Sequence, residues 1–247
     1  MNLYIQCQQR SVKGFLICDE SETHRKAYIE KLLTDAPFTI DKVAAVYPGK
    51  QHVPFRDALM SCSKQRTGKD LLMGELGCLL SHRRVWSMIV KQANNDQDHF
   101  LVFESDSMIA HPLFLNNNFD RLTKEKDIFF WGAWEGHMKL FKSSRKDVDG
   151  QFTVGTPFIK TAYCTYGYSL NKKAASLLLE RTNKISHPVD QFKYFFKQDE
   201  LRLGGVLPEV IKGNQITSTI REKENAFFKK AFLAVLDLKN NIICSLR

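Results

Sequence analysis

The sequence predicts an α/β fold with a Rossmann-like layer of strands and helices. Short apolar runs, of the length typical of buried strands, alternate with stretches whose apolar residues recur at helical spacing. The chain has 247 residues, enough for one large α/β domain, and shows no internal repeat and no low-complexity linker. We therefore expect one main domain over residues 1–220, followed by a basic amphipathic helical tail at 221–247.

The N-terminal part predicts a strand, a helix and a second strand. Residues 14–18, GFLIC, form an apolar run suited to a buried strand. The polar turn after it offers Ser21 or Thr23 as the cap of a helix at 24–33. Residues 39–49 then read as a second strand that ends in a Pro-Gly turn. This order is the opening of a Rossmann-like layer.

Further strands and helices follow along the chain. Residues 51–70 are polar and irregular, and we expect a loop there with at most a short helix. The predicted helices lie at 74–92, at 171–184 with Asn171 as its cap, and at 187–198. The predicted strands lie at 100–103, 127–132, 161–170 and 203–211.

The C-terminal residues 225–247 combine phenylalanines and leucines with lysines. The pattern predicts a helix, and two interpretations of that helix stay open. It either packs on the domain or rests as a basic amphipathic helix on an anionic membrane surface.

Composition limits the class of protein. Hydrophobic residues make up 43% and charged residues 26% of the chain, which is ordinary for a globular protein. No stretch approaches the roughly 18 apolar residues that span a bilayer, and the N-terminus lacks the apolar segment of a signal peptide. We therefore expect a cytoplasmic protein. The six cysteines lack CxxC spacing, which favours free thiols.

The formal net charge of +9 calls for an acidic partner. Nucleic acid, anionic membrane surfaces and phosphorylated substrates all offer clustered negative charge. No helix-turn-helix, RNA-recognition or zinc-finger signature is present. Charge alone leaves the three partner classes open.

Residues 100–107, FLVFESDS, form an apolar strand that ends in two acids, Glu104 and Asp106. Such strand ends are where α/β proteins bind ligands. Side chains at i and i+2 leave a strand on the same side, so both carboxylates are expected to reach one ion. Mg²⁺ and Mn²⁺ bind through one or two carboxylates together with substrate phosphates. Taken alone, the pair also fits an ordinary solvated strand end.

The segment GELGCLLSHRRVW, followed by FLVFESD, resembles glycosyltransferase family 25, which includes bacterial lipooligosaccharide galactosyltransferases. The family pattern is a Gly-Glu-x-Gly-Cys-x-x-Ser-His helix and then an apolar strand that ends in Glu-Asp-Asp. Weaker similarities extend over roughly residues 14–220, among them Arg25 in the first helix and HPVDQF around Asp190. The positions that match the helix motif are Gly74, Glu75, Gly77, Cys78, Ser81 and His82.

One departure from the family pattern concerns the acidic triplet, where Ser105 stands in place of the middle acid. If metal binding uses the outer pair, Asp106 remains the direct ligand and Glu104 the supporting or sugar-facing acid. If it needs the middle position, the metal would bind more weakly.

The resemblance implies a GT-A fold, Mn²⁺ or Mg²⁺ as cofactor and a nucleotide-sugar donor, most simply UDP-galactose, with inversion at the anomeric carbon. The acceptor would be a lipooligosaccharide or a related surface glycan, with peripheral contact to the inner face of the cytoplasmic membrane. Two rivals remain. One keeps the chemistry with a glucose or N-acetylhexosamine donor, and the other is a basic nucleic-acid-binding protein without catalysis.

Two acids are candidates for the catalytic base that an inverting transfer needs. Asp190 follows a proline turn, where a helix N-cap is the alternative role. Glu135 lies near Trp131 and Trp134 in WGAWEG, a combination that suits sugar recognition. The alternative for both tryptophans is ordinary packing.

The remaining donor-site candidates lie on the motif helix. His82 and Arg83 are candidates for contact with the donor or its diphosphate, against the alternatives of a structural histidine and a solvated charge. Glu75, near the start of the helix, is a donor-site candidate that would equally complement the helix dipole.

Overall fold

The computed structural model of the chain describes residues 12–19, 21–36, 38–133, 136–163, 165–213 and 226–247, with only the backbone over 226–235. An eight-stranded mixed sheet runs through the molecule in the order β2-β1-β3-β8-β5-β9-β7-β6, beside a two-stranded sheet β10-β4. The strands are β1 (Lys13–Cys18), β2 (Thr39–Ala44), β3 (Phe100–Glu104), β4 (Ser107–Ile109), β5 (Ile128–Phe130), β6 (Lys146–Val148), β7 (Phe152–Gly155), β8 (Gly167–Leu170), β9 (Leu203–Leu207) and β10 (Ile211–Gly213).

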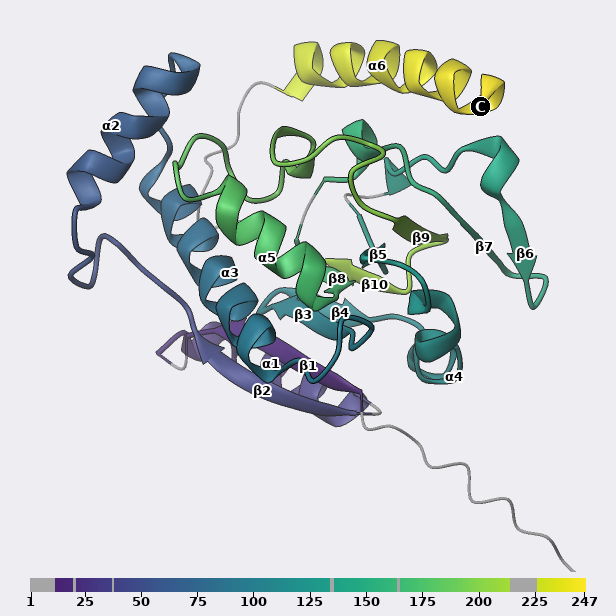
Figure 1. Cartoon of the computed structure of the whole chain (residues 1–247), viewed down its shortest axis with the longest axis horizontal. Helices are drawn as coiled ribbons and strands as arrows, with labels where there is room; N and C mark the ends of the chain where they lie inside the picture. Colours follow the sequence, from purple (N-terminus) through teal and green to yellow (C-terminus); the bar gives the residue numbers. More distant parts are fainter. Residues whose placement is uncertain (1–11, 20, 37, 134–135, 164, 214–225) are drawn as a thin grey trace, which may run out of the picture.

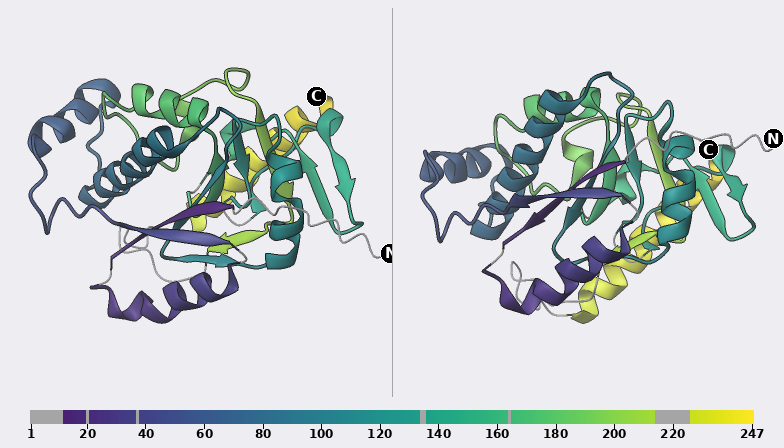
Figure 2. Two further views of the ribbon diagram at one scale, coloured as in Figure 1. Left: turned by 60° about the horizontal axis from the view of Figure 1, so that its bottom comes forward. Right: turned by 90° about the horizontal axis from the view of Figure 1, so that it is seen from below.

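Helices cover both faces of the large sheet. In Figure 1, α3 and α5 lie side by side across the sheet, while α2 stands at the edge of the molecule. The left view of Figure 2 shows α1 on the opposite side of β1 and β2 from α3. The helices are α1 (Lys26–Asp35), α2 (Arg56–Thr67), α3 (Met73–Gln92), α4 (Pro112–Thr123), α5 (Lys172–Arg181) and α6 (Ala226–Leu246).

Strand alternation divides the apolar side chains between two cores. On β3, Phe100 and Val102 join the core under α3 and α5, and Leu101 and Phe103 join the core under α1 and α4. A strand buried on both faces reads as a continuous apolar run, and this is why FLVF carries no polar residue. The α/β fold with a mixed, Rossmann-like sheet flanked by helices is therefore confirmed.

The parallel strands β1, β2 and β3 open the sheet and determine where the polar edge lies. β1 pairs in parallel with β2 on one side and β3 on the other, with Ile17 beside Glu104. β8 lies antiparallel between β3 and β5. The C-terminal ends of β1, β2 and β3 therefore meet at one edge of the sheet.

Several local predictions differ from the structure. The 51–70 segment contains the 12-residue helix α2 rather than a short one. Only Gly167–Leu170 of the predicted strand at 161–170 is a strand, and only Phe192–Tyr194 of the predicted helix at 187–198 is helical, as a 3₁₀ turn. The β6–β7 hairpin was not predicted, because its residues show no clear alternation. Asn171 caps α5 as expected, accepting from the Ala174 amide at 3.0 Å.

The C-terminal end of α6 packs on the domain. Cys244 is 1% exposed and lies in a small apolar cluster with Phe141 and Phe158. Lys139 forms an ion pair with Asp237 of the helix at 3.0 Å. The predicted helix is thus present and its end contacts the domain, while the division of the chain at residue 220 stays a prediction. Among the described residues, no helix has the length and apolar character needed to cross a membrane.

Candidate active site

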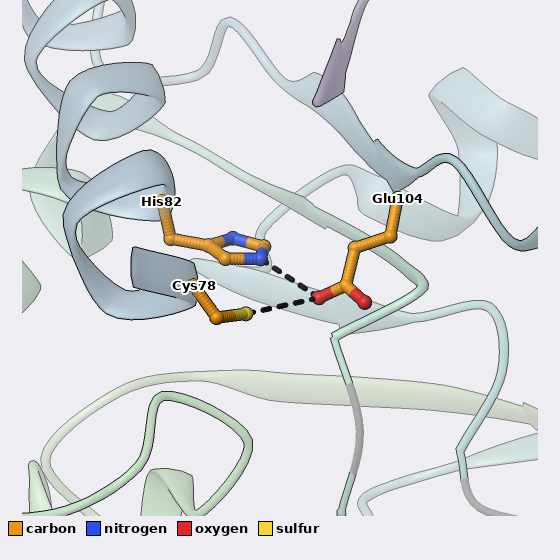
Figure 3. A group of neighbouring side chains, drawn as sticks. All are labelled: Cys78, His82 and Glu104. Carbon is orange, nitrogen blue, oxygen red and sulfur yellow. Dashed lines mark hydrogen bonds and ion pairs between the residues drawn. The ribbon is translucent and has the colours of Figure 1, made fainter. Parts of the chain in front are cut away.

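Polar side chains gather where β3 ends, against α3. Cys78 and His82 lie one turn apart on α3 and point toward Glu104, the last residue of β3 (Figure 3). His82 Nε2 is 3.0 Å from Glu104 Oε1, and Cys78 Sγ is 3.6 Å from the same oxygen. Val102 lies in the core under α3, so the strand period of two turns Glu104 toward the same helix.

A second stripe of α3 explains the glycine and serine of the motif. A Cβ on Gly77 would stand 2.4 Å from the Val46 carbonyl oxygen, so α3 can approach the segment after β2 only with glycine there. One turn on, Ser81 Oγ accepts from the Val46 amide at 2.8 Å. The stripe of Gly77 and Ser81 fixes the helix, and the neighbouring stripe of Cys78 and His82 faces the carboxylate.

A buried chain of hydrogen bonds runs from the core to Glu104. The Trp86 indole donates to Tyr168 Oη at 2.9 Å, and Tyr168 Oη lies 2.8 Å from His82 Nδ1. Because an ionised carboxylate only accepts, His82 Nε2 carries the hydrogen that Glu104 receives. In the neutral ring, Nδ1 then accepts the Tyr168 hydroxyl hydrogen. The order of donation is Trp86, Tyr168, His82, Glu104.

The two oxygens of Glu104 have different surroundings. Oε1 accepts from His82, from Cys78 and from the Thr165 hydroxyl. Burial by itself would raise the pKa of Glu104, but the hydrogen bonds from His82, Thr165 and Cys78 outweigh it and hold the pKa below its usual value. The side chain is 25% exposed, and Oε2 has no hydrogen bond within the described part of the chain. Glu104 is thus an ionised carboxylate whose Oε2 is left to contact a ligand.

The Cys78 thiol is held in its protonated form. Burial raises its pKa well above the ordinary value, and the negative charges of Glu104, Asp190 and Asp106 raise it further. Sγ, His82 Nε2 and Glu104 Oε1 lie within 4.8 Å of one another, a spacing also found in metal sites. Since both donors already direct hydrogens at Oε1, we read this trio as a hydrogen-bonded cluster. The influence of Asp190 on the thiol brings that acid to the same site.

Asp106 lies in the turn between β3 and β4 rather than on the strand. The expectation that strand alternation aligns it with Glu104 is therefore wrong, although the turn still brings the two charges close enough to interact. Burial and the Glu104 charge raise the pKa of Asp106 to about 6, and Arg25 opposes this. Its Oδ1 is buried and has no hydrogen-bond partner among the described residues.

Ser105 contacts the residue that precedes α1. Its Oγ accepts from Arg25 Nη1 at 2.6 Å, and Arg25 Nε lies 3.3 Å from Glu22 Oε2. Tyr47, after β2, donates to Glu22 Oε1 at 3.0 Å. The serine that departs from the family pattern thus receives a buried guanidinium, and this network joins the ends of all three parallel strands.

The donor set fits a divalent cation. A buried carboxylate oxygen without a partner, on a group whose ionisation is disfavoured by burial and by a second carboxylate, is the arrangement that a bound cation stabilises. Asp106 Oδ1 and Glu104 Oε2 supply hard oxygen donors of the kind Mg²⁺ and Mn²⁺ prefer. The expected ligands Asp106 and Glu104 are therefore compatible with the metal, which stays a proposal.

The other candidates on α3 lie apart from the carboxylates or have another role. Arg83 donates to the Leu179 carbonyl at 2.8 Å and to Asn183 Oδ1 at 2.9 Å, so it joins α3 to the end of α5. Glu75 accepts from the Leu72 amide at 3.0 Å and caps the start of α3. His82 is fully buried, and its two ring nitrogens contact Tyr168 and Glu104 rather than a ligand-facing surface.

Of the two candidates for the catalytic base, the structure describes Asp190 but not Glu135. Asp190 does not cap the 3₁₀ turn at Phe192–Tyr194, because Gln191 occupies that position, and its charge acts on Cys78. Glu135 lies outside the described residues. Trp131, which we associated with sugar recognition, is fully buried in the core and donates to Ser169 Oγ at 3.0 Å, so that interpretation is wrong.

Sequence reasoning missed Thr165 and Tyr168, which both support Glu104. They precede and lie on β8, which pairs with β3 so that Tyr168 stands opposite Val102. The strand was predicted, but its neighbour was not, and no local pattern indicates which strand it joins.

Comparisons with known proteins identify the family of the chain. The sequence profile described as glycosyltransferase family 25 (LPS biosynthesis protein) matches residues 12–193. A "Glycosyltransferase 25 family member" from Anopheles gambiae is 30% identical over 131 residues, which are 50% of this chain and 20% of that relative. The match therefore spans about a fifth of the relative's length.

Proposed function

The chain belongs to glycosyltransferase family 25, and we propose that it transfers a hexose, most simply galactose, from a UDP-sugar to a surface-glycan acceptor with inversion. The observation that carries the proposal is the pair of unlike carboxylates, Glu104 and Asp106, at the end of β3, with Asp190 close by. An inverting transfer uses acids at two positions, one set beside the donor diphosphate and one for the acceptor proton.

The donor side would be formed by the ends of the parallel strands. A bound Mn²⁺ or Mg²⁺ would supply charge that stabilises the leaving diphosphate. Asp106 and Glu104 would hold this cation, with Cys78, His82 and Thr165 fixing the orientation of Glu104. The chain's net charge of +9 fits a phosphate-bearing donor.

On the acceptor side, Asp190 would act as the base. The acceptor oxygen attacks the anomeric carbon from the face opposite the diphosphate, and the bond from that carbon to the diphosphate oxygen breaks. The acceptor proton passes to the Asp190 carboxylate, and UDP leaves with the electron pair. No covalent enzyme intermediate is needed.

The acceptor would be a lipooligosaccharide or related glycolipid at the inner face of a membrane. An exposed apolar stripe on α6 supports this proposal, since Leu238, Ile242 and Leu246 are 64%, 54% and 82% exposed. Residues at i, i+4 and i+8 share one helix face, so the stripe is available to a lipid surface while Cys244 packs inward.

The first experiment measures UDP-sugar binding and hydrolysis with and without Mn²⁺. UDP-galactose should raise the melting temperature in the presence of the metal, because a ligand of the native state stabilises it. A larger shift with UDP-glucose or a UDP-N-acetylhexosamine would reassign the donor. Salt-sensitive nucleic-acid binding without any UDP-sugar binding would refute the proposal.

Two substitutions test the roles of the acids. Asp106→Ala should abolish transfer and Mn²⁺-dependent stabilisation while leaving the fold intact, whereas Asp120→Ala, which removes an exposed carboxylate from α4, should change neither. Asp190→Asn should lower turnover with little loss of donor affinity. Wild-type turnover in the first variant, or collapsed donor affinity in the last, would contradict the assignments.

A further inference from the structure

An aromatic cluster with a central lysine is formed by chain segments before and after α5. The His187 and Tyr194 rings stack, with centroids 3.8 Å apart and planes 13° apart. Lys193 Nζ lies 4.9 Å from the centroid of Tyr163 and 5.0 Å from that of Tyr194, and it donates to Tyr163 Oη at 3.2 Å. Tyr194 is 51% exposed. We call these four residues the aromatic platform.

The aromatic platform is joined to the candidate active site through two chain segments. Tyr163 is two residues from Thr165, whose hydroxyl donates to Glu104. Lys193 is three residues from Asp190, whose charge acts on Cys78. Both chain segments that build the platform therefore also carry groups of the site.

The platform is basic. Lys193 has no carboxylate within ion-pair distance in the part of the chain that the structure describes. Burial lowers the pKa of His187, and the positive charges of Arg66 and Lys193 lower it further. His187 therefore stays neutral near pH 7 and packs as an uncharged ring against Tyr194. Tyr194 is thus an exposed aromatic ring whose orientation is fixed by stacking on His187. Beside it lies Lys193, which forms no ion pair with a described carboxylate.

We propose that the aromatic platform is the acceptor subsite and that it binds a saccharide with an anionic substituent, a phosphate or a carboxylate. The apolar face of the sugar ring packs on Tyr194, and the anionic group lies at Lys193. This inference rests on the proposed function, since a transferase needs an acceptor beside its base. The fixed ring and lysine reduce the ordering cost of binding.

Saccharide binding tests the platform without any transfer. The probes are glucose 6-phosphate, glucuronic acid and glucose, with inorganic phosphate as the control without a sugar, each followed by ligand-observed NMR. Both charged sugars should bind at least several-fold more tightly than glucose. Tyr194→Ala should weaken every saccharide about tenfold or more, Tyr194→Phe should retain binding, and Lys193→Met should remove the preference for charged sugars.

The results separate this inference from the proposed function. The inference would be overturned if inorganic phosphate bound as tightly as glucose 6-phosphate. It would equally be overturned if Tyr194→Ala left saccharide affinity unchanged. UDP-galactose affinity is measured in parallel on the same proteins. If the wild type binds no UDP-sugar while saccharide binding still depends on Tyr194, the platform stands as a saccharide site, and its role as an acceptor subsite fails together with the transferase proposal. A larger response to glucose 6-phosphate or to glucuronic acid identifies the source of the negative charge.

Discussion

At the scale of single residues, the chemistry depends on how each carboxylate is held. Glu104 receives three donors on one oxygen, and its pKa is lowered. Asp106 has a buried oxygen without a hydrogen-bond partner among the described residues, and its pKa is raised to about 6. Two acids that are two residues apart thus have opposite tendencies to ionise. This difference follows from their hydrogen-bond partners rather than from their residue type.

The buried chain that ends at Glu104 gives the first prediction. Tyr168→Phe removes the hydroxyl between Trp86 and His82, so His82 loses the group that fixes its ring. We expect transfer to fall about tenfold or more, and the acidic limb of its pH profile to move to higher pH as Glu104 loses support.

The matched control for that change is Tyr166→Phe, since Tyr166 donates to the Ala133 carbonyl and does not belong to the chain. Its pH profile should stay that of the wild type. Equal shifts in both variants would indicate general loosening of the site and contradict the positioning role of Tyr168.

His99, at the other end of β3, gives a prediction about pH and stability. Burial lowers its pKa to about 4, and its Nε2 donates to the Lys126 carbonyl at 2.8 Å. Nδ1 is buried and has no hydrogen-bond partner in the part of the chain that the structure describes. Between pH 4 and the ordinary value of 6.5 the unfolded state therefore binds more protons. The stability that comes from keeping His99 uncharged in the fold is fully present above pH 6.5 and is lost as the pH falls to about 4.

The free energy of unfolding should fall by about 3 kcal/mol from this group over that range. Denaturant titrations at several pH values measure the effect, and His99→Gln, which keeps a side-chain donor but does not titrate, should flatten the dependence. An equally steep dependence in the variant would assign the acid sensitivity to other groups.

At the scale of elements, α3 is positioned by contacts with no room for adjustment. The Gly77 stripe lies against the Val46 carbonyl and Pro48, and Ser81 satisfies the Val46 amide. The position of this helix determines where Cys78 and His82 stand relative to β3. A small displacement of α3 would therefore change the site without removing any of its residues.

Gly77→Ala tests this contact. The added methyl would stand 2.4 Å from the Val46 oxygen, so α3 or the segment after β2 must shift, at a cost of about 1–3 kcal/mol. We expect a lower melting temperature and reduced transfer. Gly49→Ala is the control, because its nearest contact would be Met73 Cγ at an ordinary 3.9 Å. Equal effects in the two variants would contradict the packing argument.

At the scale of the whole molecule, α6 contacts the domain near its C-terminal end and exposes an apolar stripe. Cys244 and Asp237 bind the helix to the β6–β7 side of the fold, and Leu238, Ile242 and Leu246 remain exposed. The two interpretations of this helix in the sequence, packing and membrane contact, are thus compatible because they use different faces.

Replacing Leu238, Ile242 and Leu246 together by serine should reduce cosedimentation with phosphatidylglycerol-containing vesicles severalfold, because lipid contact depends on buried apolar area. Activity on a soluble acceptor should be retained. Asn241→Ala, an exposed change beside the stripe, serves as the control. Unchanged vesicle binding in the triple variant would refute membrane contact through this face.

By itself the sequence determined the α/β fold, the motif helix, the acidic end of β3 and the family. Each of these is encoded in local periodicity or in spacing within one segment. The tertiary structure decided what surrounds the acids. The antiparallel insertion of β8 between β3 and β5 brings Tyr168 and Thr165 to Glu104, and the turn after β3 buries Asp106 near Arg25. Strand pairing and burial join segments far apart in the chain, and the pKa of a carboxylate depends on those neighbours, so no local pattern could reveal them.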